Sequence, residues 1–97
     1  MSFGEVLKEL RTSKGIGIKK MAKDVGLDYT YISKLENSKA NPSSKVVGKI
    51  SEYFSYNADE LMLSAGIMPK DIEEILRNNP REAVKYLRRK FLGDRSK

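Results

Sequence analysis

The sequence predicts an all-α protein, with five helices in an N-terminal domain and two more in a C-terminal extension. Three observations support this fold class. Apolar residues recur at spacings of three and four, as on one face of a helix. Glycine, proline and asparagine separate these segments, and no segment has the alternating apolar pattern of a strand. The domain is expected over residues 1–65 and the extension over residues 66–97.

Each predicted helix has an apolar stripe and a residue that starts or ends it. The first stripe comprises Phe3, Val6, Leu7 and Leu10, and its helix is expected to end at Gly15. The five helices of the domain are expected at residues 3–14, 18–25, 29–37, 44–54 and 58–65. The two helices of the extension begin near Pro69 and Pro80, because proline fits the first turn of a helix.

The composition weighs against an enzyme, and its positive charge suits a polyanionic partner and equally an ordinary soluble protein. The 97 residues carry a formal charge of +6 and contain no cysteine and no histidine. Disulfides, thiolate metal sites and the most common catalytic base are therefore excluded, and we expect no metal, no cofactor and no enzymatic activity. The charged N-terminus and the short apolar stretches predict a cytoplasmic protein that does not enter a membrane.

Residues 18–36 have the pattern of a helix-turn-helix, in which two short helices pack at a steep angle. Ala22 is small where the helices approach, and Gly26 lies in the tight turn, where positive φ is expected. Asp28 is suited to cap the second helix, Tyr29 to Asn37. The expected apolar wedge comprises Met21, Val25, Leu27, Ile32 and Leu35. Any one of these residues suits an ordinary core, but their joint spacing predicts a DNA-binding domain.

Over about residues 3 to 65 the sequence resembles the lambdoid repressor and Cro family of Xre-type helix-turn-helix proteins. The resemblance rests on the Leu-Arg pair of the first helix and on Ala22, Gly26, Ile32, Leu35-Glu36-Asn37, Asn41-Pro42 and Asp59-Glu60-Leu61. It implies a five-helix lambda-repressor-like domain and a sequence-specific regulator of transcription, a repressor in the first instance. It also implies a structural ion pair between Arg11 and Glu36, since family members commonly pair these positions.

A recognition helix reads base edges with its N-terminal residues and those one turn further on. The base-reading candidates are therefore Tyr29, Thr30, Ser33 and Lys34. Since Ile32 points inward, Tyr29 and Tyr31 cannot both be buried, and at least one is expected on the surface. Phosphate contacts are expected before and after this helix, from Lys19, Lys20, Asn37, Lys39, Asn41, Ser43, Ser44 and Lys45.

The sequence departs from the family at Gly17 and Ile18, where members commonly have serine or threonine followed by glutamine. The glutamine contact to phosphate is lost there. Free backbone N–H groups at the helix start remain as an anion site. We therefore expect the loop after Asn37 to provide more of the contacts to DNA phosphates.

The extension is a candidate dimerisation element, because a small head buries too little surface for tight binding to a near-palindromic operator. Val84, Leu87 and Phe91 form the candidate stripe for a homodimer. Packing within the chain, onto the first and fifth helices, is an alternative. A different class of function is a protein-binding regulator or antitoxin whose C-terminal helices capture a partner protein. Eight lysines against three acidic residues between Lys14 and Lys49 favour DNA.

Overall fold

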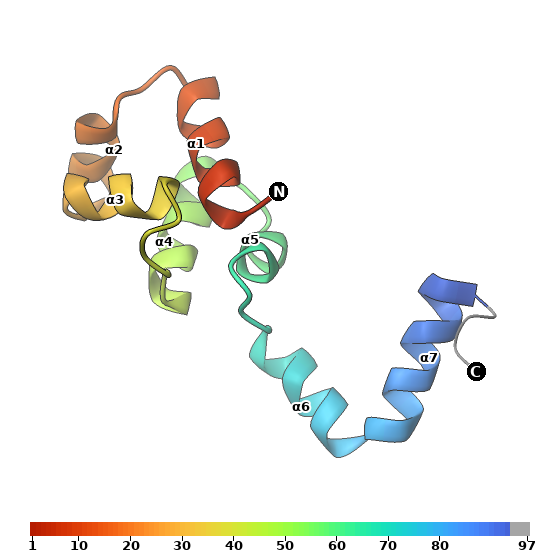
Figure 1. Ribbon diagram of the computed structural model, residues 1–97. Helices are drawn as coiled ribbons and strands as arrows, with labels where there is room; N and C mark the ends of the chain where they lie inside the picture. The colour runs from red at the N-terminus through yellow and green to blue at the C-terminus, as the bar shows by residue number, and fades with distance from the viewer. Residues whose placement is uncertain (94–97) are drawn as a thin grey trace. The chain divides into compact units, whose positions relative to one another are not determined.

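The computed structural model describes residues 1–93, which are helical and contain no strand (Figure 1). This confirms the all-α prediction. The helices are α1 (Phe3–Ser13), α2 (Ile18–Val25), α3 (Tyr29–Glu36), α4 (Ser44–Phe54), α5 (Ala58–Ser64), α6 (Lys70–Asn78) and α7 (Pro80–Leu92). They form two units, which we call unit 1 (Met1–Ile67) and unit 2 (from Met68 onward). Within the described residues, no helix is both long enough and apolar enough to cross a membrane.

The predicted helix boundaries differ from the observed ones by a residue at some ends. The helix predicted to run from Tyr29 to Asn37 ends at Glu36, and Asn37 is its C-cap. The first helix ends at Ser13, with Lys14 as C-cap. Such differences arise because the last turn of a helix frays into its cap.

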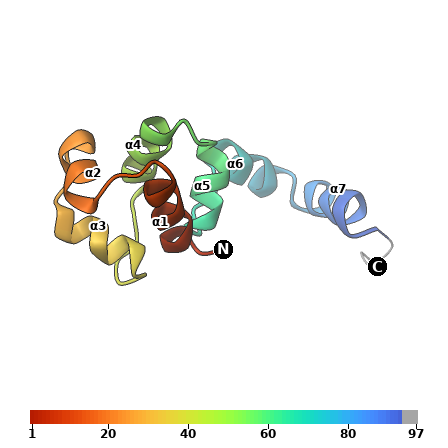
Figure 2. The same ribbon diagram turned by 90° about the horizontal axis from the view of Figure 1, so that it is seen from above.

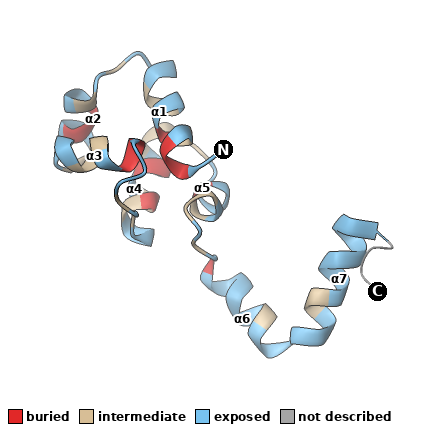
Figure 3. Ribbon diagram, viewed as in Figure 1, coloured by how far each residue is buried: buried red, intermediate tan, exposed pale blue. Residues whose placement is uncertain are grey.

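Unit 1 contains the hydrophobic core, and all five of its helices contribute to it (Figure 3). The largest fully buried side chains are Leu7, Met21, Ile32, Leu35, Val47, Ile50 and Leu61. In Figures 1 and 2, α2 and α3 lie side by side at one end of this unit, and α5 lies at the other. The core therefore fixes the two helices of the helix-turn-helix against the remaining three.

Helix starts in unit 1 are capped by short polar side chains. Ser2 and Glu5 form a reciprocal capping box at α1, and Asp28, Ser43 and Asn57 accept a backbone N–H at α3, α4 and α5. Helix α2 has no side-chain cap, since its N-cap residue is Gly17. The start of α2 thus keeps backbone donors without an intrahelical partner.

The five helices of unit 1 all end in the same turn, in which one residue adopts the left-handed conformation. For α3 this residue is Ser38, with φ of 58°, and the Lys39 N–H donates back to the Lys34 carbonyl at 2.7 Å. This is the Schellman pattern, for which glycine is the preferred residue. Ser55 has the corresponding place after α4, with φ of 51°. The other three helices end with glycine.

Gly4 lies where α1 passes close to the backbone of α3. A Cβ atom there would lie 2.6 Å from the Leu35 carbonyl oxygen and 2.7 Å from that of Glu36. Real Cβ atoms do not approach carbonyl oxygens so closely, so only glycine fits without movement of the helices. This close crossing sets α1 against the C-terminal end of α3.

Unit 2 consists of α6 and α7, joined at Asn79. Neither helix contains a buried residue. On α6, Arg77 and Glu73 form an exposed ion pair one turn apart. The stability of this hairpin therefore does not come from a core of its own.

Candidate nucleic-acid interface

The two helices of the helix-turn-helix are joined by three residues, of which Gly26 makes the turn. Gly26 has φ of 72°, and the Leu27 N–H donates to the Ala22 carbonyl at 3.0 Å. A side chain at this φ is strained, which explains the glycine. Ala22 is buried below the turn, while Val25 and Leu27 are partly buried. These positions agree with the spacing predicted for a helix-turn-helix.

A hollow of about 820 Å³ lies where α2 and α3 face solvent. All four base-reading candidates line it: Tyr29, Thr30, Ser33 and Lys34. Four of the phosphate candidates line it too, namely Lys19, Lys20, Asn37 and Lys39. Arg11, Gly17 and Ile18 complete the lining, which contains five cationic side chains and no carboxylate. Two of the five are paired with carboxylates outside the hollow, Arg11 with Glu36 and Lys20 with Asp24, whereas no ion pair within the described residues involves Lys19, Lys34 or Lys39. The hollow is therefore electropositive and suited to a polyanion.

Thr30 is held by Asp28, the N-cap residue of α3. Its backbone N–H donates to the Asp28 carboxylate at 3.0 Å, and its hydroxyl donates to the same oxygen at 2.9 Å. The backbone hydrogen bond from Thr30, followed by the hydroxyl, lowers the pKa of Asp28 below its ordinary value. A hydroxyl has only one proton to donate. Asp28 therefore orients Thr30, an exposed residue whose methyl group and oxygen lone pairs remain for other contacts.

Tyr29 and Tyr31 differ in exposure, as the inward position of Ile32 predicts. Tyr29 is 47% exposed, while Tyr31 packs against the core cluster. The Lys19 ammonium lies 5.2 Å from the centre of the Tyr29 ring, within cation–π range. Tyr29 is thus an exposed aromatic side chain that is oriented by a cation of the preceding helix.

The remaining phosphate candidates lie outside the hollow, in the loop after α3 and at the start of α4. Asn41, Ser43, Ser44 and Lys45 are exposed. The Ser43 hydroxyl accepts the Val46 N–H at 3.2 Å, so it caps α4. Inside the hollow, the Asn37 amide donates to the Ser33 carbonyl at 2.9 Å. The structure therefore divides the predicted phosphate contacts into two groups, one lining the hollow and one at the α4 N-terminus.

Arg11 and Glu36 form a bidentate ion pair between α1 and the end of α3. Arg11 Nε donates to Glu36 Oε2 at 2.6 Å and Nη2 donates to Oε1 at 3.0 Å. The third nitrogen, Nη1, donates to the Ile16 carbonyl at 2.9 Å. The two side chains are only 12% and 4% exposed, and the hydrogen bond to Glu36 raises the pKa of Arg11 above its ordinary value. The pair fixes α3 to α1 and to the loop before α2.

A second polar cluster joins α2 to α4 on the surface. The Tyr53 hydroxyl donates to Asp24 Oδ2 at 2.7 Å, and Lys20 pairs with Asp24 at 3.1 Å. These two hydrogen bonds, that from Tyr53 first, lower the pKa of Asp24. The Lys14 ammonium lies 4.0 Å from the centre of the Tyr53 ring. Nothing in the local sequence pattern predicts this cluster, because its members are brought together only by helix packing.

The three dimer candidates lie on α7 of unit 2. Leu87 and Phe91 are exposed and Val84 is half-buried. Gly17 and Ile18 also line the hollow, and no side-chain contact to DNA is predicted for either of them. Their only sequence signal is the departure from the family pattern at the start of α2.

Comparison with known proteins identifies the class of fold. Residues 4–67 match the family model described as a helix-turn-helix domain. The chain therefore belongs to the helix-turn-helix family, and within it to the Xre-type regulators, which are not enzymes. This confirms the resemblance predicted from the sequence.

The relatives of this chain carry regulator names. The SPbeta prophage-derived HTH-type transcriptional regulator YonR of Bacillus subtilis is 35% identical over 82 residues, which cover 84% of this chain and 74% of YonR. The HTH-type transcriptional activator BcrR of Enterococcus faecalis is 37% identical over 62 residues, covering 64% of this chain. The match spans only 30% of BcrR, so the likeness to that protein is restricted to one part of it.

Proposed function

We propose that this chain is a DNA-binding regulator of transcription that reads double-stranded DNA in the major groove with α3. The observation that carries the proposal is the hollow beside α3, which is lined by all four base-reading candidates and by no carboxylate, with Lys19, Lys34 and Lys39 as its cations outside the ion pairs of Arg11 and Lys20. Such a surface attracts phosphates and presents hydrogen-bonding groups between them. The proposal places the regulator in the cytoplasm, with the DNA on which it acts.

In the proposal, each base-reading residue of α3 makes its own kind of contact with a base. Lys34 donates to the acceptor atoms of guanine, and Tyr29 contacts base edges through its ring or hydroxyl. Thr30, whose hydroxyl proton is committed to Asp28, offers its methyl group to the thymine methyl. Ser33 is the fourth base-facing residue.

In the proposal, contacts to the DNA phosphates come from two helix N-termini and from basic and polar side chains. The first N–H groups of α2 have no side-chain cap, and those of α4 follow Ser43, so both can donate to phosphate. Lys19, Lys20, Asn37 and Lys39 act inside the hollow. Asn41, Ser44 and Lys45 act at the α4 start.

We further propose that two copies of the chain bind together to a near-palindromic operator. A single helix-turn-helix domain buries too little surface against DNA for tight binding. We propose repression as the mode of action, because a bound dimer blocks access to a promoter without any other contact. The name of BcrR as an activator makes activation the competing outcome. A reporter gene behind the selected operator separates the two: the proposal expects expression to rise when the regulator is deleted.

The decisive experiment is selection of binding sites from random duplexes, followed by gel shifts with three matched lysine variants. Lys34→Ala should reduce discrimination at one base pair by about tenfold or more. Lys39→Ala should weaken all duplexes alike and lower the slope of affinity against salt by about one. Lys49→Ala, an exposed lysine of α4 that does not line the hollow, is the control and should change neither. If Lys39→Ala altered the selected sequence while Lys34→Ala altered only the salt slope, the assignment of α3 would be wrong.

A further inference from the structure

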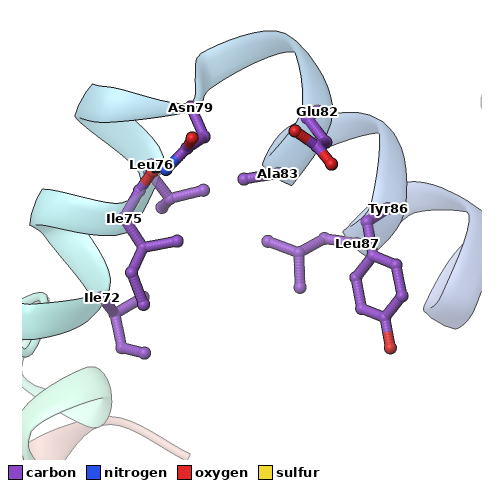
Figure 4. A pocket seen from close by; sticks show the side chains of 8 residues that line it. All are labelled: Ile72, Ile75, Leu76, Asn79, Glu82, Ala83, Tyr86 and Leu87. Carbon is purple, nitrogen blue, oxygen red and sulfur yellow. Dashed lines mark hydrogen bonds between the residues drawn. The ribbon is translucent and has the colours of Figure 1, made fainter.

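Helix α7 of unit 2 has two unlike sides. One side lines a groove of about 420 Å³ between α6 and α7, where Ala83, Tyr86 and Leu87 face apolar side chains of α6 (Figure 4). The spacing i, i+4, i+7 and i+8 places four cations within an arc of about 100° on the opposite side of the helix. These residues, which we call the basic face, are Arg81, Lys85, Arg88 and Arg89.

No carboxylate neutralises the basic face. Its four side chains are exposed, and no ion pair within residues 1–93 involves any of them. The single carboxylate of α7, Glu82, lines the groove. On the outward side of α6, by contrast, Glu74 lies between Lys70 and Arg77, and Arg77 is paired with Glu73. A solvated helix surface usually mixes charges as α6 does, so the basic face of α7 needs another explanation.

The basic face also disfavours the helix on which it lies. Lys85 is about one turn from each of the other three cations, and like charges at these spacings oppose helix formation. The helix dipole favours cations in the last turn, but Arg81 lies in the first turn, where the positive end of the dipole repels it. Helix α7 contains no buried residue to offset this repulsion. A polyanion bound along the basic face removes it.

The length and residue types of the basic face fit the phosphates of duplex DNA. From Arg81 to Arg89 the helix rises about 12 Å, over which one DNA strand carries about three or four phosphates. Three of the four cations are arginines, whose guanidinium groups bind a phosphate through two hydrogen bonds at once. In the proposed function, such a duplex is present whenever α3 is bound. The covalent connection between the units then keeps α7 at a high local concentration near that duplex.

We propose that the basic face of α7 binds phosphates of the DNA that flanks the base pairs read by α3. The contact rests on the proposed function and adds to it a source of affinity that does not depend on base sequence. An anionic membrane is another surface that a basic helix can bind. Membrane binding requires the apolar side of α7 to enter the lipid, and that side faces α6 across the groove. This arrangement favours DNA, and binding to lipid is an outcome of the test.

Two double variants of equal net charge test the contact. R81Q/R88Q removes two cations from the basic face. K70Q/K90Q is the matched control, because Lys70 lies on α6 and Lys90 lies on the groove side of α7, one turn after Leu87. Each variant lowers the formal charge of the chain by two, from +6 to +4. Glutamine has nearly the helix propensity of arginine and lysine, so both variants should keep the circular dichroism of the unaltered protein.

Gel shifts over a range of salt concentrations compare two duplexes. One ends at the selected operator, and the other extends beyond it by one turn of DNA, about 10 base pairs, on each side. The unaltered protein should bind the extended duplex more tightly and with a steeper salt dependence. R81Q/R88Q should lower the slope of log affinity against log salt by about two for each bound chain on the extended duplex, and leave the short one unaffected. K70Q/K90Q should match the unaltered protein on both.

Two results of the gel shifts would overturn the inference: equal affinity of the unaltered protein for the two duplexes, or equal effects of the two variants. Co-sedimentation with vesicles of phosphatidylserine and phosphatidylcholine in equal amounts tests the lipid alternative. If R81Q/R88Q lost vesicle binding and kept its full affinity for the extended duplex, the basic face would bind membranes and the inference would be wrong.

Failure of this contact is distinguishable from failure of the proposed function. Selective binding to the short operator duplex, with no gain from flanking DNA, would remove the contact of α7 and leave the role of α3. Binding to random duplexes without any sequence selection would remove the reading role of α3. In that case a loss of random-duplex binding in R81Q/R88Q, and not in K70Q/K90Q, would still support the contact between α7 and phosphates.

Discussion

Leu61 in unit 1 and Leu87 in unit 2 each lie on the apolar stripe of an amphipathic helix, yet the first is fully buried and the second is 40% exposed. Unit 1 brings five helices around such stripes and closes a core. Unit 2 has two helices whose stripes line an open groove. The comparison shows that an amphipathic pattern identifies the apolar face of a helix, but does not identify the element that packs against that face.

Truncation of leucines in the two units should give the largest contrast. Leu61→Ala should lower the free energy of unfolding of unit 1 by about 3 kcal/mol, because it leaves a cavity in the core. Leu63→Ala on the same helix should change it by less than about 0.5 kcal/mol. Leu87→Ala should also leave unit 1 unchanged. Urea unfolding followed by circular dichroism gives these values, and an equal loss at Leu61 and Leu63 would contradict the core as described.

The ion pairs of the two units allow the second test. Arg11→Ala leaves the Glu36 carboxylate buried without its partner, so it should destabilise unit 1 by about 3 kcal/mol. Arg77→Ala breaks the exposed pair of unit 2 and should cost less than about 0.5 kcal/mol. A double-mutant cycle with Glu36→Gln isolates the coupling between Arg11 and Glu36. A coupling energy near zero would show that the pair does not hold α1 to α3.

Two helical glycines of unit 1 provide the third test. Gly4→Ala places a Cβ atom against two carbonyl oxygens of α3 and should destabilise the unit by about 1–3 kcal/mol. Gly48→Ala in α4 meets nothing within 4 Å and should stabilise it by about 0.5–1 kcal/mol. Thermal unfolding of both variants measures the difference. Equal effects of the two substitutions would mean that α1 and α3 do not cross closely at Gly4.

The left-handed serines should give the smallest effect. Ser38→Gly and Ser55→Gly each relieve a strained φ and should stabilise unit 1 by about 1 kcal/mol. Gly15→Ser, at the corresponding turn after α1, should destabilise it by a similar amount. The melting temperature of each variant reports the change. A fall in stability on either serine-to-glycine change would show that the side chain contributes more than the strain costs.

Most of the fold and part of the site were predictable from local sequence. The apolar spacing identified every helix, and Gly26 and Asp28 marked the turn and cap that start α3. The four base-reading candidates do lie together at the hollow, because residues one turn apart share a helix face. Ser38 and Ser55 gave no such signal, since serine is common in many loops and seldom adopts the left-handed conformation.

The sequence by itself determined the class of fold, the helix-turn-helix and the positive charge of its surface, because these follow from residue type and short-range spacing. Tertiary structure decided which distant residues meet. It placed Gly4 against the carbonyls of Leu35 and Glu36, committed the Thr30 hydroxyl to Asp28 and divided the phosphate candidates between the hollow and the start of α4. It also left the stripes of α6 and α7 open to solvent. The physical reason is that periodicity fixes the direction of a side chain relative to its own helix, whereas packing between helices decides what that side chain touches.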